Sequence, residues 1–442
     1  MKTKNCIACL ALLFSAAQMY AQDPIIQTKY TADPAPLVHN DTVFLYTSHD
    51  EDDAQSYSFK MLDWQLYTST DMVNWTDRGT VASLQNFKWR RRDNGAWAQQ
   101  VVERNGKFYM YCPLHGNGIG VLVADSPYGP FRDPIGKPLV WQKEHWEDID
   151  PTVFVDDDGQ AYMYWGNPNL YYVKLNPDMI STQGEIVKVG KLDTYQEGPW
   201  FYKRNGHYYL AFASTCCPEG IGYAMSHSAT GPWEVKGYIM RPTERSRGNH
   251  PGIIDYKGKS YVFGQNLDLL KLTTNEHHER RSVSVAEMHY NADGTIQEVP
   301  YWKDTKVQQI EYLNPYRRAE AETMAWGFGL KTAPLQGGGI YVKDIDDGET
   351  LTVRGVDFGR KGAKRFMAQV ASAKGNSRIE IHLDSADGPL AGILSVDATE
   401  GEDVFKQMSC RVKGVQGVHD VVFCFKGDAK ENLFHFDWWQ FR

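Results

Sequence analysis

A pattern that recurs five times along the first 300 residues is the strongest constraint on the fold of this chain. Each copy has a polar or small residue, a short apolar run, a tight turn and an aromatic-rich strand. Successive copies start 65, 52, 47 and 53 positions apart, at Asp33, Ala98, Asp150, Glu197 and His250. Asn-Gly and Asp-Gly turns between apolar runs are typical of β-hairpins. Short strands repeated about every fifty residues predict an all-β fold, a five-bladed β-propeller with four strands per blade.

The first residue of each copy lies where the innermost strand of a blade would begin. Inner strands line the central channel of a propeller, so the five starting residues should surround one mouth of that channel. Asp33, Asp150 and Glu197 would then bring three carboxyl groups together beside His250. Carboxyl groups that lie close together cannot all ionise freely, so the pKa of one rises while that of another stays low. One site can then supply both the proton donor and the proton acceptor that acid–base catalysis requires. The alternative is that Asp33 and Asp150 only cap strands before Pro34 and Pro151.

The acidic run "DDDG" at 156–159 has two interpretations. It resembles part of a calcium-binding loop, but the later acidic ligand of such loops is missing. We therefore favour a solvent-exposed turn.

Composition and targeting signals exclude some classes of function. The net charge of −8 and the absence of long basic runs argue against nucleic acid as a partner, while 13% aromatic residues suit β-strands and surfaces that stack on sugars. The N-terminus has a basic start, an apolar run and a small-residue end, which predict a signal peptide over residues 1–21. No later segment has the length of a transmembrane helix. We expect a protein exported to the periplasm or the extracellular space.

Five cysteines follow the predicted signal peptide, without the spacing of a zinc site. Cys410 and Cys424 fall on two predicted strands and could form a disulfide. Cys216 and Cys217 are adjacent, and joining them requires a strained eight-membered ring. We expect two half-buried thiols there.

Residues 25–300 resemble glycoside hydrolase family 43, whose members are five-bladed propellers with inverting chemistry. The resemblance is carried by "ADPAPL", "DIDPTVFVDDDG" and "EGPWFYKRNGHYYL". It implies that Asp33 is the general base, that Glu197 is the general acid, and that Asp150 modulates and orients this acid. His250 in "GNHPGI" matches the position that often holds a cation or water in the channel, which implies a calcium ion there. From first principles a single histidine is a poor calcium ligand.

Further pocket residues are expected from the same resemblance and from position. "HHERRSVSVAEMHYNADGTIQEV" is similar to the closing segment of the family, in which an arginine reaches the sugar; we choose Arg281. Arg280 remains the alternative, because adjacent strand residues point to opposite faces. Trp97 either stacks on a sugar or packs in the core. His49 and Asp50 either contact substrate or are solvated.

The predicted catalytic domain covers residues 25–305 and is followed by a linker at 306–317. After the linker the sequence pattern changes to short alternating strands. Residues 318–442 resemble a family 6 carbohydrate-binding module, a β-sandwich with jelly-roll topology, through "AEAE", "VDFG" and "FDWWQF". The resemblance implies a structural calcium held by Glu320, Glu322 and Asp437. His435 and Phe405 replace a ligand-binding asparagine and a stacking tryptophan of the family. The module therefore either binds sugar or only supports the propeller.

Together these features predict an inverting exo-glycosidase that acts on plant cell-wall polysaccharides or oligosaccharides and needs no cofactor for its chemistry. Our first choice is an α-L-arabinofuranosidase involved in xylan degradation, and a β-xylosidase is the alternative. A non-catalytic sugar-binding protein is disfavoured, since it would not need all three acids. A structural scaffold would need no converging acids and would expose an apolar face.

Overall fold

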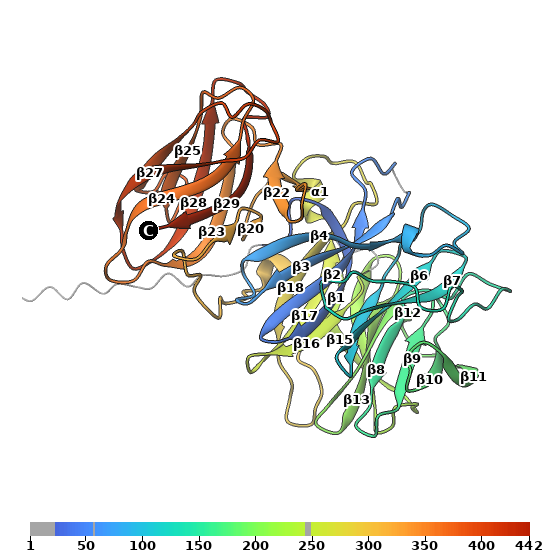
Figure 1. The fold of residues 1–442 in the computed structure, drawn as a ribbon. Coiled ribbons are helices and arrows are strands. Elements are labelled where there is room, and N and C mark those ends of the chain that lie inside the picture. Colours follow the sequence, from blue (N-terminus) through green and yellow to red (C-terminus); the bar gives the residue numbers. More distant parts are fainter. Residues whose placement is uncertain (1–22, 56–57, 244–248) are drawn as a thin grey trace, which may run out of the picture.

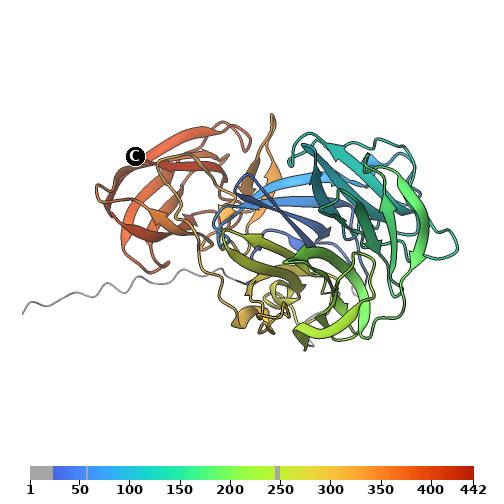
Figure 2. The ribbon, with the colours of Figure 1, turned by 90° about the horizontal axis from the view of Figure 1, so that it is seen from below.

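Five antiparallel sheets surround one axis in the N-terminal two thirds of the chain (Figures 1 and 2). The computed structural model describes residues 23–55, 58–243 and 249–442. The predicted signal peptide lies outside this range. The five sheets are the predicted propeller blades. Their order along the chain is the order of the five repeats.

The strands of the blades follow each other from the channel outward. The first blade contains β1 (Tyr30–His39), β2 (Thr42–Asp50), β3 (Asp63–Ser69) and β4 (Trp75–Ser83). The second contains β5 (Gln100–Arg104), β6 (Lys107–Leu114) and β7 (Gly118–Ala124). The third contains β8 (Thr152–Val155), β9 (Ala161–Trp165), β10 (Tyr171–Leu175) and β11 (Thr182–Lys188). The fourth contains β12 (Tyr195–Arg204), β13 (His207–Ser214), β14 (Glu219–Ser226) and β15 (Glu234–Thr243). The fifth contains β16 (Gly252–Tyr256), β17 (Lys259–Asn266) and β18 (Ser282–Met288).

The inner hairpin of each blade follows from its turn residues. Asn105 and Gly106 both have positive φ values, of 52° and 72°, and Asn205 and Gly206 repeat this with 48° and 79°. Two successive positive φ values define the tight turn that matches the twist of paired strands, and asparagine and glycine adopt them most readily. Local sequence therefore sets the register of these hairpins.

The prediction of four strands in every blade is wrong for the second and fifth blades, which have three named strands each. In the second blade, a segment rich in proline continues the sheet beyond β7 only as isolated bridges, Ile119 to Val140 and Val123 to Arg132. Proline lacks the backbone N–H that a continuous ladder needs. In the fifth blade, the segment before β1 lies beside β18, with Ile25 N–H donating to the Val283 carbonyl at 3.0 Å. This contact helps to close the ring of blades.

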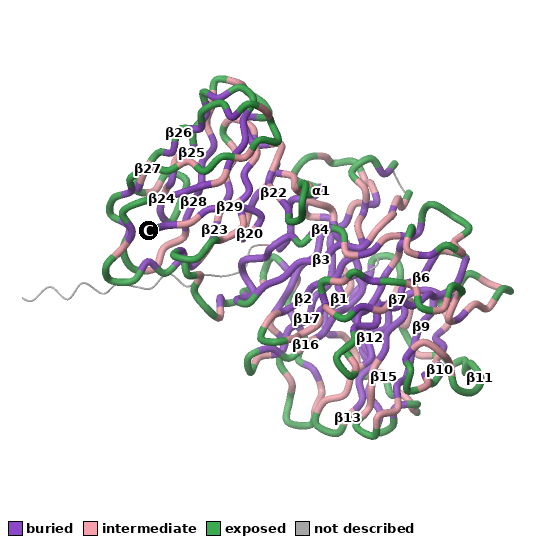
Figure 3. The backbone as a smooth tube through the Cα atoms, viewed as in Figure 1, coloured by how far each residue is buried: buried purple, intermediate pink, exposed green. Residues whose placement is uncertain are grey.

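The C-terminal third is a sandwich of two antiparallel sheets (red and orange in Figure 1). One sheet contains β21 (Lys331–Pro334), β22 (Ile340–Lys343), β29 (His435–Phe441), β24 (Ala363–Ala371) and β27 (Lys406–Val415), with β19 (Ala319–Glu320) beside β29. The other contains β23 (Thr350–Asp357), β28 (Val418–Gly427), β25 (Ser377–Leu383) and β26 (Leu390–Val396). The only helices among the described residues are α1 (Asp268–Lys271) and two 3₁₀ turns, Leu84–Asn86 and Trp302–Asp304. The inner sheet faces are buried and the connecting loops are largely exposed (Figure 3).

The two domains share a sheet. Strand β20 (Thr323–Met324), at the start of the sandwich domain, pairs antiparallel with β4 and becomes the outermost strand of the first blade. Next to it, the Asn74 side chain donates to the Arg354 carbonyl and accepts from the Arg354 N–H, both at 2.9 Å. Backbone pairing together with a two-way amide contact fixes the sandwich against the propeller.

Candidate active site

The five starting residues of the repeats line one cavity of about 280 Å³. They come from the beginnings of the inner strands, as the repeat predicts. Asp33 and Glu197 lie within β1 and β12, whereas Ala98, Asp150 and His250 directly precede β5, β8 and β16. The volume is close to the lower end of typical ligand pockets. It suits one monosaccharide unit better than a long polysaccharide segment.

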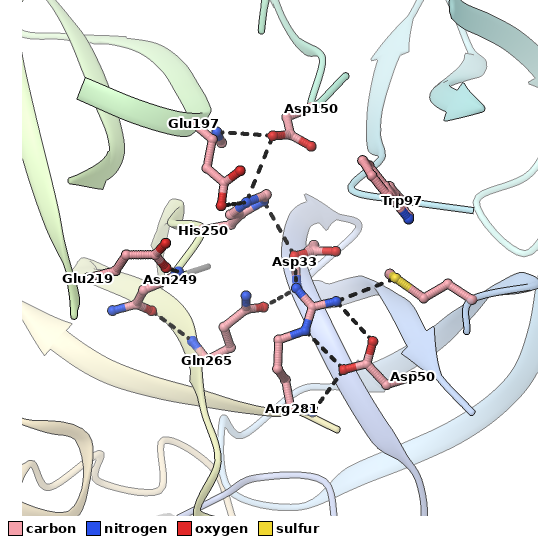
Figure 4. Close-up of polar contacts among 12 residues, drawn as sticks. Asp33, Asp50, Trp97, Asp150, Glu197, Glu219, Asn249, His250, Gln265 and Arg281 are labelled. Carbon is pink, nitrogen blue, oxygen red and sulfur yellow. Dashed lines mark hydrogen bonds and ion pairs between the residues drawn. The ribbon is translucent and has the colours of Figure 1, made fainter. Parts of the chain in front are cut away.

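His250 lies between the three carboxyl groups (Figure 4). Its Nδ1 is 3.4 Å from Asp33 Oδ1, while its Nε2 is 3.5 Å from Glu197 Oε1 and 3.8 Å from Asp150 Oδ2. Asp33 and Glu197 therefore face opposite sides of one imidazole ring. The Glu197 side chain is 17% exposed, against 3% for Asp33 and 4% for Asp150, so it is the carboxyl most open to an incoming ligand.

The electrostatics of this cluster follow from burial and from mutual charge. Burial raises the pKa of Asp150 to about 7, with further increases from Glu197 and Asp33 that oppose the effect of His250. Burial alone would lower the pKa of His250, but Asp150, Asp33 and Glu197 outweigh it and raise this pKa to about 10. The imidazole is therefore a cation at neutral pH, and it compensates for part of the negative charge around it.

Unusual backbone conformations position the cluster. Asp33 and Asp150 have left-handed φ values of 52° and 54°, and each precedes a proline. The matching left-handed residue of the fourth repeat is Gly198, with φ of 56°, so Glu197 lies one position earlier than the aspartates do. A Cβ atom on Gly198 would lie 2.6 Å from Cγ of His250. Only glycine allows this approach, and backbone strain of this kind is common at functional sites.

Arg281 lines the cavity and is paired with two carboxylates. Its Nη1 donates to Asp33 Oδ1 at 3.1 Å, while Nε and Nη2 both donate to Asp50 at 2.9 Å. Burial would lower the pKa of Arg281, but Asp33 and Asp50 raise it, so the guanidinium stays charged. Arg280 lies elsewhere and donates to the Ala54 carbonyl at 3.1 Å. The structure thus places Arg281, and not Arg280, at the cavity.

The other predicted pocket residues divide into two groups. Trp97 lines the cavity, half-buried against His115, with ring centroids 4.1 Å apart. Asp50 is fully buried behind Arg281, and His49 pairs with Asp63 at 2.9 Å. Neither His49 nor Asp50 lines the cavity.

Several cavity residues were not identified from the sequence. Glu219, at the start of β14, accepts a hydrogen bond from the Asn249 backbone N–H at 2.9 Å, and burial raises its pKa to about 7. Asn167 donates to Glu197 from the loop after β9. Trp146 is 46% exposed at the cavity. The only sequence signal was a tryptophan in an acidic stretch, because these side chains lie outside the repeated pattern.

Both expectations about the cysteines are wrong. Cys216 and Cys217 form a disulfide, and both are exposed where they line the cavity. Cys410 and Cys424 are free thiols, as is the buried Cys112. Cys410 lies on β27, which pairs with β24, whereas Cys424 lies on β28 in the opposite sheet. Placement in different sheets explains why the two strands do not bring these thiols together.

The cluster around His250 lies where the family resemblance implies a calcium ion. Ligand atoms of Asp150, Glu197 and His250 lie within 4.8 Å of one another, which is close enough to surround an ion. However, both ring nitrogens of His250 face carboxylate oxygens, 3.4 Å from Asp33 Oδ1 and 3.5 Å from Glu197 Oε1. Calcium also prefers oxygen ligands. On chemical grounds His250 is a weak calcium ligand, and an ion at this position stays a prediction.

Two of the three acidic residues predicted to bind calcium in the sandwich domain pair with Arg318. This arginine is 2.7 Å from Glu320 Oε2 and 3.4 Å from Asp437 Oδ1. Glu322 is buried, its Oε2 has no hydrogen-bond partner, and burial raises its pKa well above the ordinary value. A buried carboxyl oxygen without a partner could serve as a ligand for a cation. The three carboxyls do not form a group within 4.8 Å among the described residues.

The sandwich domain has a polar cavity of its own, of about 420 Å³. His435 lies on its wall with Tyr341, and their ring centroids are 4.7 Å apart. Phe405 packs on Tyr341 at 5.5 Å. Both residues that depart from the family pattern are therefore at or beside this cavity.

Comparisons with known proteins agree with this architecture. The profile described as "Glycosyl hydrolases family 43" matches residues 21–296, and that described as "Carbohydrate binding module (family 6)" matches residues 320–442. An arabinoxylan arabinofuranohydrolase of Bacillus subtilis is 35% identical, covering 95% of this chain and 92% of the relative. A xylosidase/arabinosidase of Bacteroides ovatus is 30% identical over 62% of this chain and 95% of the relative.

Among solved structures, a family 43 arabinoxylan arabinofuranohydrolase from Bacillus subtilis in complex with cellotetraose aligns with a TM-score of 0.85. The two sequences are 34% identical, and the alignment covers 95% of this chain and 97% of the other. The similarity therefore extends through both domains.

Proposed function

Because this chain belongs to glycosyl hydrolase family 43 and carries a family 6 carbohydrate-binding module, we propose that it is an inverting exo-acting α-L-arabinofuranosidase that removes arabinose side chains from xylan. The observation that supports this most strongly is the single cavity in which Asp33, Asp150 and Glu197 surround His250. The near full-length similarity to an arabinoxylan arabinofuranohydrolase favours the substrate.

In the proposed mechanism, Glu197 donates a proton to the glycosidic oxygen while Asp33 accepts a proton from the attacking water. Inverting enzymes hold these two carboxyls roughly 6.5–9.5 Å apart, which leaves room for the water. The imidazole between Asp33 and Glu197 is consistent with such a separation. These proposed steps use only side chains of the protein and water.

The remaining residues orient the reacting groups. Arg281 donates to Asp33 through Nη1 and is itself bound by Asp50, so the carboxylate of Asp33, the proposed base, is held in one orientation. Asp150 accepts from the Gly198 N–H at 3.3 Å and lies beside Glu197, where its charge state modulates and orients the acid. Trp97 offers an aromatic face to the sugar. His250 acts as a fixed cation among the carboxylates.

The small cavity favours cleavage of a single terminal or branching pentose over cleavage within a chain. Release of 4-nitrophenol from the α-L-arabinofuranoside and from the β-D-xyloside tests this directly. A higher kcat/KM on the arabinofuranoside supports the proposal, and a higher value on the xyloside makes the enzyme a β-xylosidase, as the Bacteroides ovatus relative suggests. Proton NMR of the first-formed sugar tests inversion, which predicts the β-anomer of arabinose.

We further propose export through the signal peptide at 1–21. Among the described residues no helix has the length and apolar character needed to cross a membrane. A structural calcium in the sandwich domain is proposed at Glu320, Glu322 and Asp437, where the unpartnered Glu322 oxygen supports it. Calcium should then raise the melting temperature of the wild-type protein and leave that of Glu322→Gln unchanged.

A further inference from the structure

The loop between β13 and β14 presents two adjacent sulfur atoms at the cavity. Cys216 and Cys217 are exposed, whereas Ser214 before them and Glu219 after them are buried. The Thr215 hydroxyl donates to the Pro218 carbonyl at 3.0 Å, which holds the two ends of this short loop together. The disulfide is therefore a fixed part of the wall, opening to the space that Asp150 and Glu197 also line.

The lining of the cavity is of two chemical kinds. The carboxyls, His250 and Arg281 contribute polar surface to the cavity, whereas Phe59, Met61 and Trp97 contribute apolar surface. A sugar ring matches this arrangement, since its hydroxyls need polar partners and its C–H faces pack on apolar, polarisable groups. A disulfide has no hydrogen-bond donor and is polarisable, so it belongs to the second kind of surface.

We propose that the Cys216–Cys217 disulfide is a sugar-contacting surface of the active site, which packs on a C–H face of the bound pentose and makes substrate affinity sensitive to reduction. This inference deepens the proposed function and rests on it. Neither cysteine takes part in the acid–base steps.

The oxidised pair suits this task better than two thiols would. Each thiol can rotate independently and carries an S–H donor, whereas the disulfide has one fixed shape. Export to an oxidising compartment, as proposed above, would preserve it. A dithiol such as dithiothreitol reverses it: the disulfide gains two electrons and two protons to give two thiols, and the reductant becomes a cyclic disulfide. In the described part of the chain the other cysteines are already thiols, so this reaction has a single site there.

The first test compares oxidised and reduced wild-type enzyme on 4-nitrophenyl α-L-arabinofuranoside. We expect reduction to lower kcat/KM about five- to tenfold, mainly through a higher KM, in the range that small changes in a pocket wall produce. Reoxidation should restore the activity, and Cys216→Ala/Cys217→Ala should not respond to the reductant. An unchanged KM while the thiol count of the denatured protein rises by two would overturn the inference.

A matched pair of variants tells whether the disulfide contacts the sugar or only stabilises the loop between β13 and β14. Cys216→Ala/Cys217→Ala and Cys216→Ser/Cys217→Ser both remove the crosslink, and they differ only in two hydroxyl groups. A contact with a C–H face predicts weaker binding by the serine pair than by the alanine pair. Equal losses in both variants, with equal melting temperatures, would show that the disulfide only braces the loop.

A binding measurement keeps this inference distinct from the proposed function. Titration of the oxidised and reduced proteins with L-arabinose, followed by tryptophan fluorescence, needs no turnover, and Trp97 and Trp146 line the same cavity. If the enzyme hydrolyses no pentoside, the proposed function is refuted. Identical arabinose affinity of the oxidised and reduced proteins would refute the role of the disulfide, whichever pentoside is cleaved.

Discussion

The imidazole of His250 packs directly on the backbone of Gly198, where a Cβ atom would lie 2.6 Å from Cγ of the ring. The glycine follows Glu197, and its N–H is 3.3 Å from Asp150 Oδ2. One residue without a side chain thus allows the cation and two of the three acids to approach each other. This close approach is the physical basis of the site.

Replacement of Gly198 by alanine should disrupt this arrangement. The new methyl group would displace His250, and the left-handed backbone at φ of 56° would be strained. We expect a destabilisation of about 2 kcal/mol and a loss of activity of about a hundredfold. Urea unfolding and kcat/KM measure the two effects. The control is Gly206→Ala, which also has positive φ but no atom within 4 Å of an added Cβ. Equal loss of activity in both variants would contradict the account.

Asp150→Asn should change the pH dependence of the enzyme. The pKa of Asp150 is raised to about 7, so the coupled acids lose a proton near neutral pH and kcat/KM should fall on the alkaline side from about pH 7. Removal of one negative charge makes the remaining proton easier to lose, and the alkaline limb should therefore move to lower pH. Profiles of kcat/KM from pH 4 to 9 for both proteins check this. An alkaline limb at the same pH in the variant would exclude the coupling.

Glu219→Gln should alter the pH dependence of stability. The pKa of this carboxyl is raised from 4.5 to about 7 by burial, with Glu197 adding to the effect. Between these values the folded protein retains a proton that the unfolded chain has lost, so the contribution to stability is present below pH 4.5 and is lost as the pH rises to 7. Relative to wild type, the free energy of unfolding of the variant should be about 3 kcal/mol higher at pH 8 than at pH 4. Urea unfolding at both pH values measures this gain.

The control for this measurement is Glu185→Gln, because Glu185 is exposed on β11 and should show no such gain. A Glu219→Gln protein whose unfolding free energy follows the wild type at every pH would show that burial does not hold the proton on Glu219.

The repeat predicted much of the fold because its information is local. Turn glycines and aromatic strands define hairpins without reference to distant residues, and the phase of the repeat then placed Asp33, Asp150, Glu197 and His250 on one ring. The family resemblance favoured Arg281 over Arg280, and Arg281 is the one that lies at the cavity.

The parts that were not predicted depend on tertiary structure. Trp146 and the disulfide reach the cavity from loops, and Glu219 reaches it from the start of β14; the surrounding blades set the path of these segments. Asp50 was considered as a substrate contact, but its direction is fixed by the buried Arg281, 231 residues away. The missing fourth strands reflect prolines in the second blade and, in the fifth, a neighbour from the N-terminal end of the chain.

The most direct test of the proposed mechanism is arabinose release from arabinoxylan by the wild type, Asp33→Asn and Glu197→Gln, with Glu185→Gln as the matched surface control. The account predicts kcat about a thousandfold lower for the first two variants and an unchanged value for the control. On an aryl arabinofuranoside with a good leaving group, Glu197→Gln should recover much of its activity whereas Asp33→Asn should not. If Glu197→Gln released arabinose from arabinoxylan at the wild-type rate, the assignment of Glu197 as the acid would be wrong, and with it the proposed mechanism.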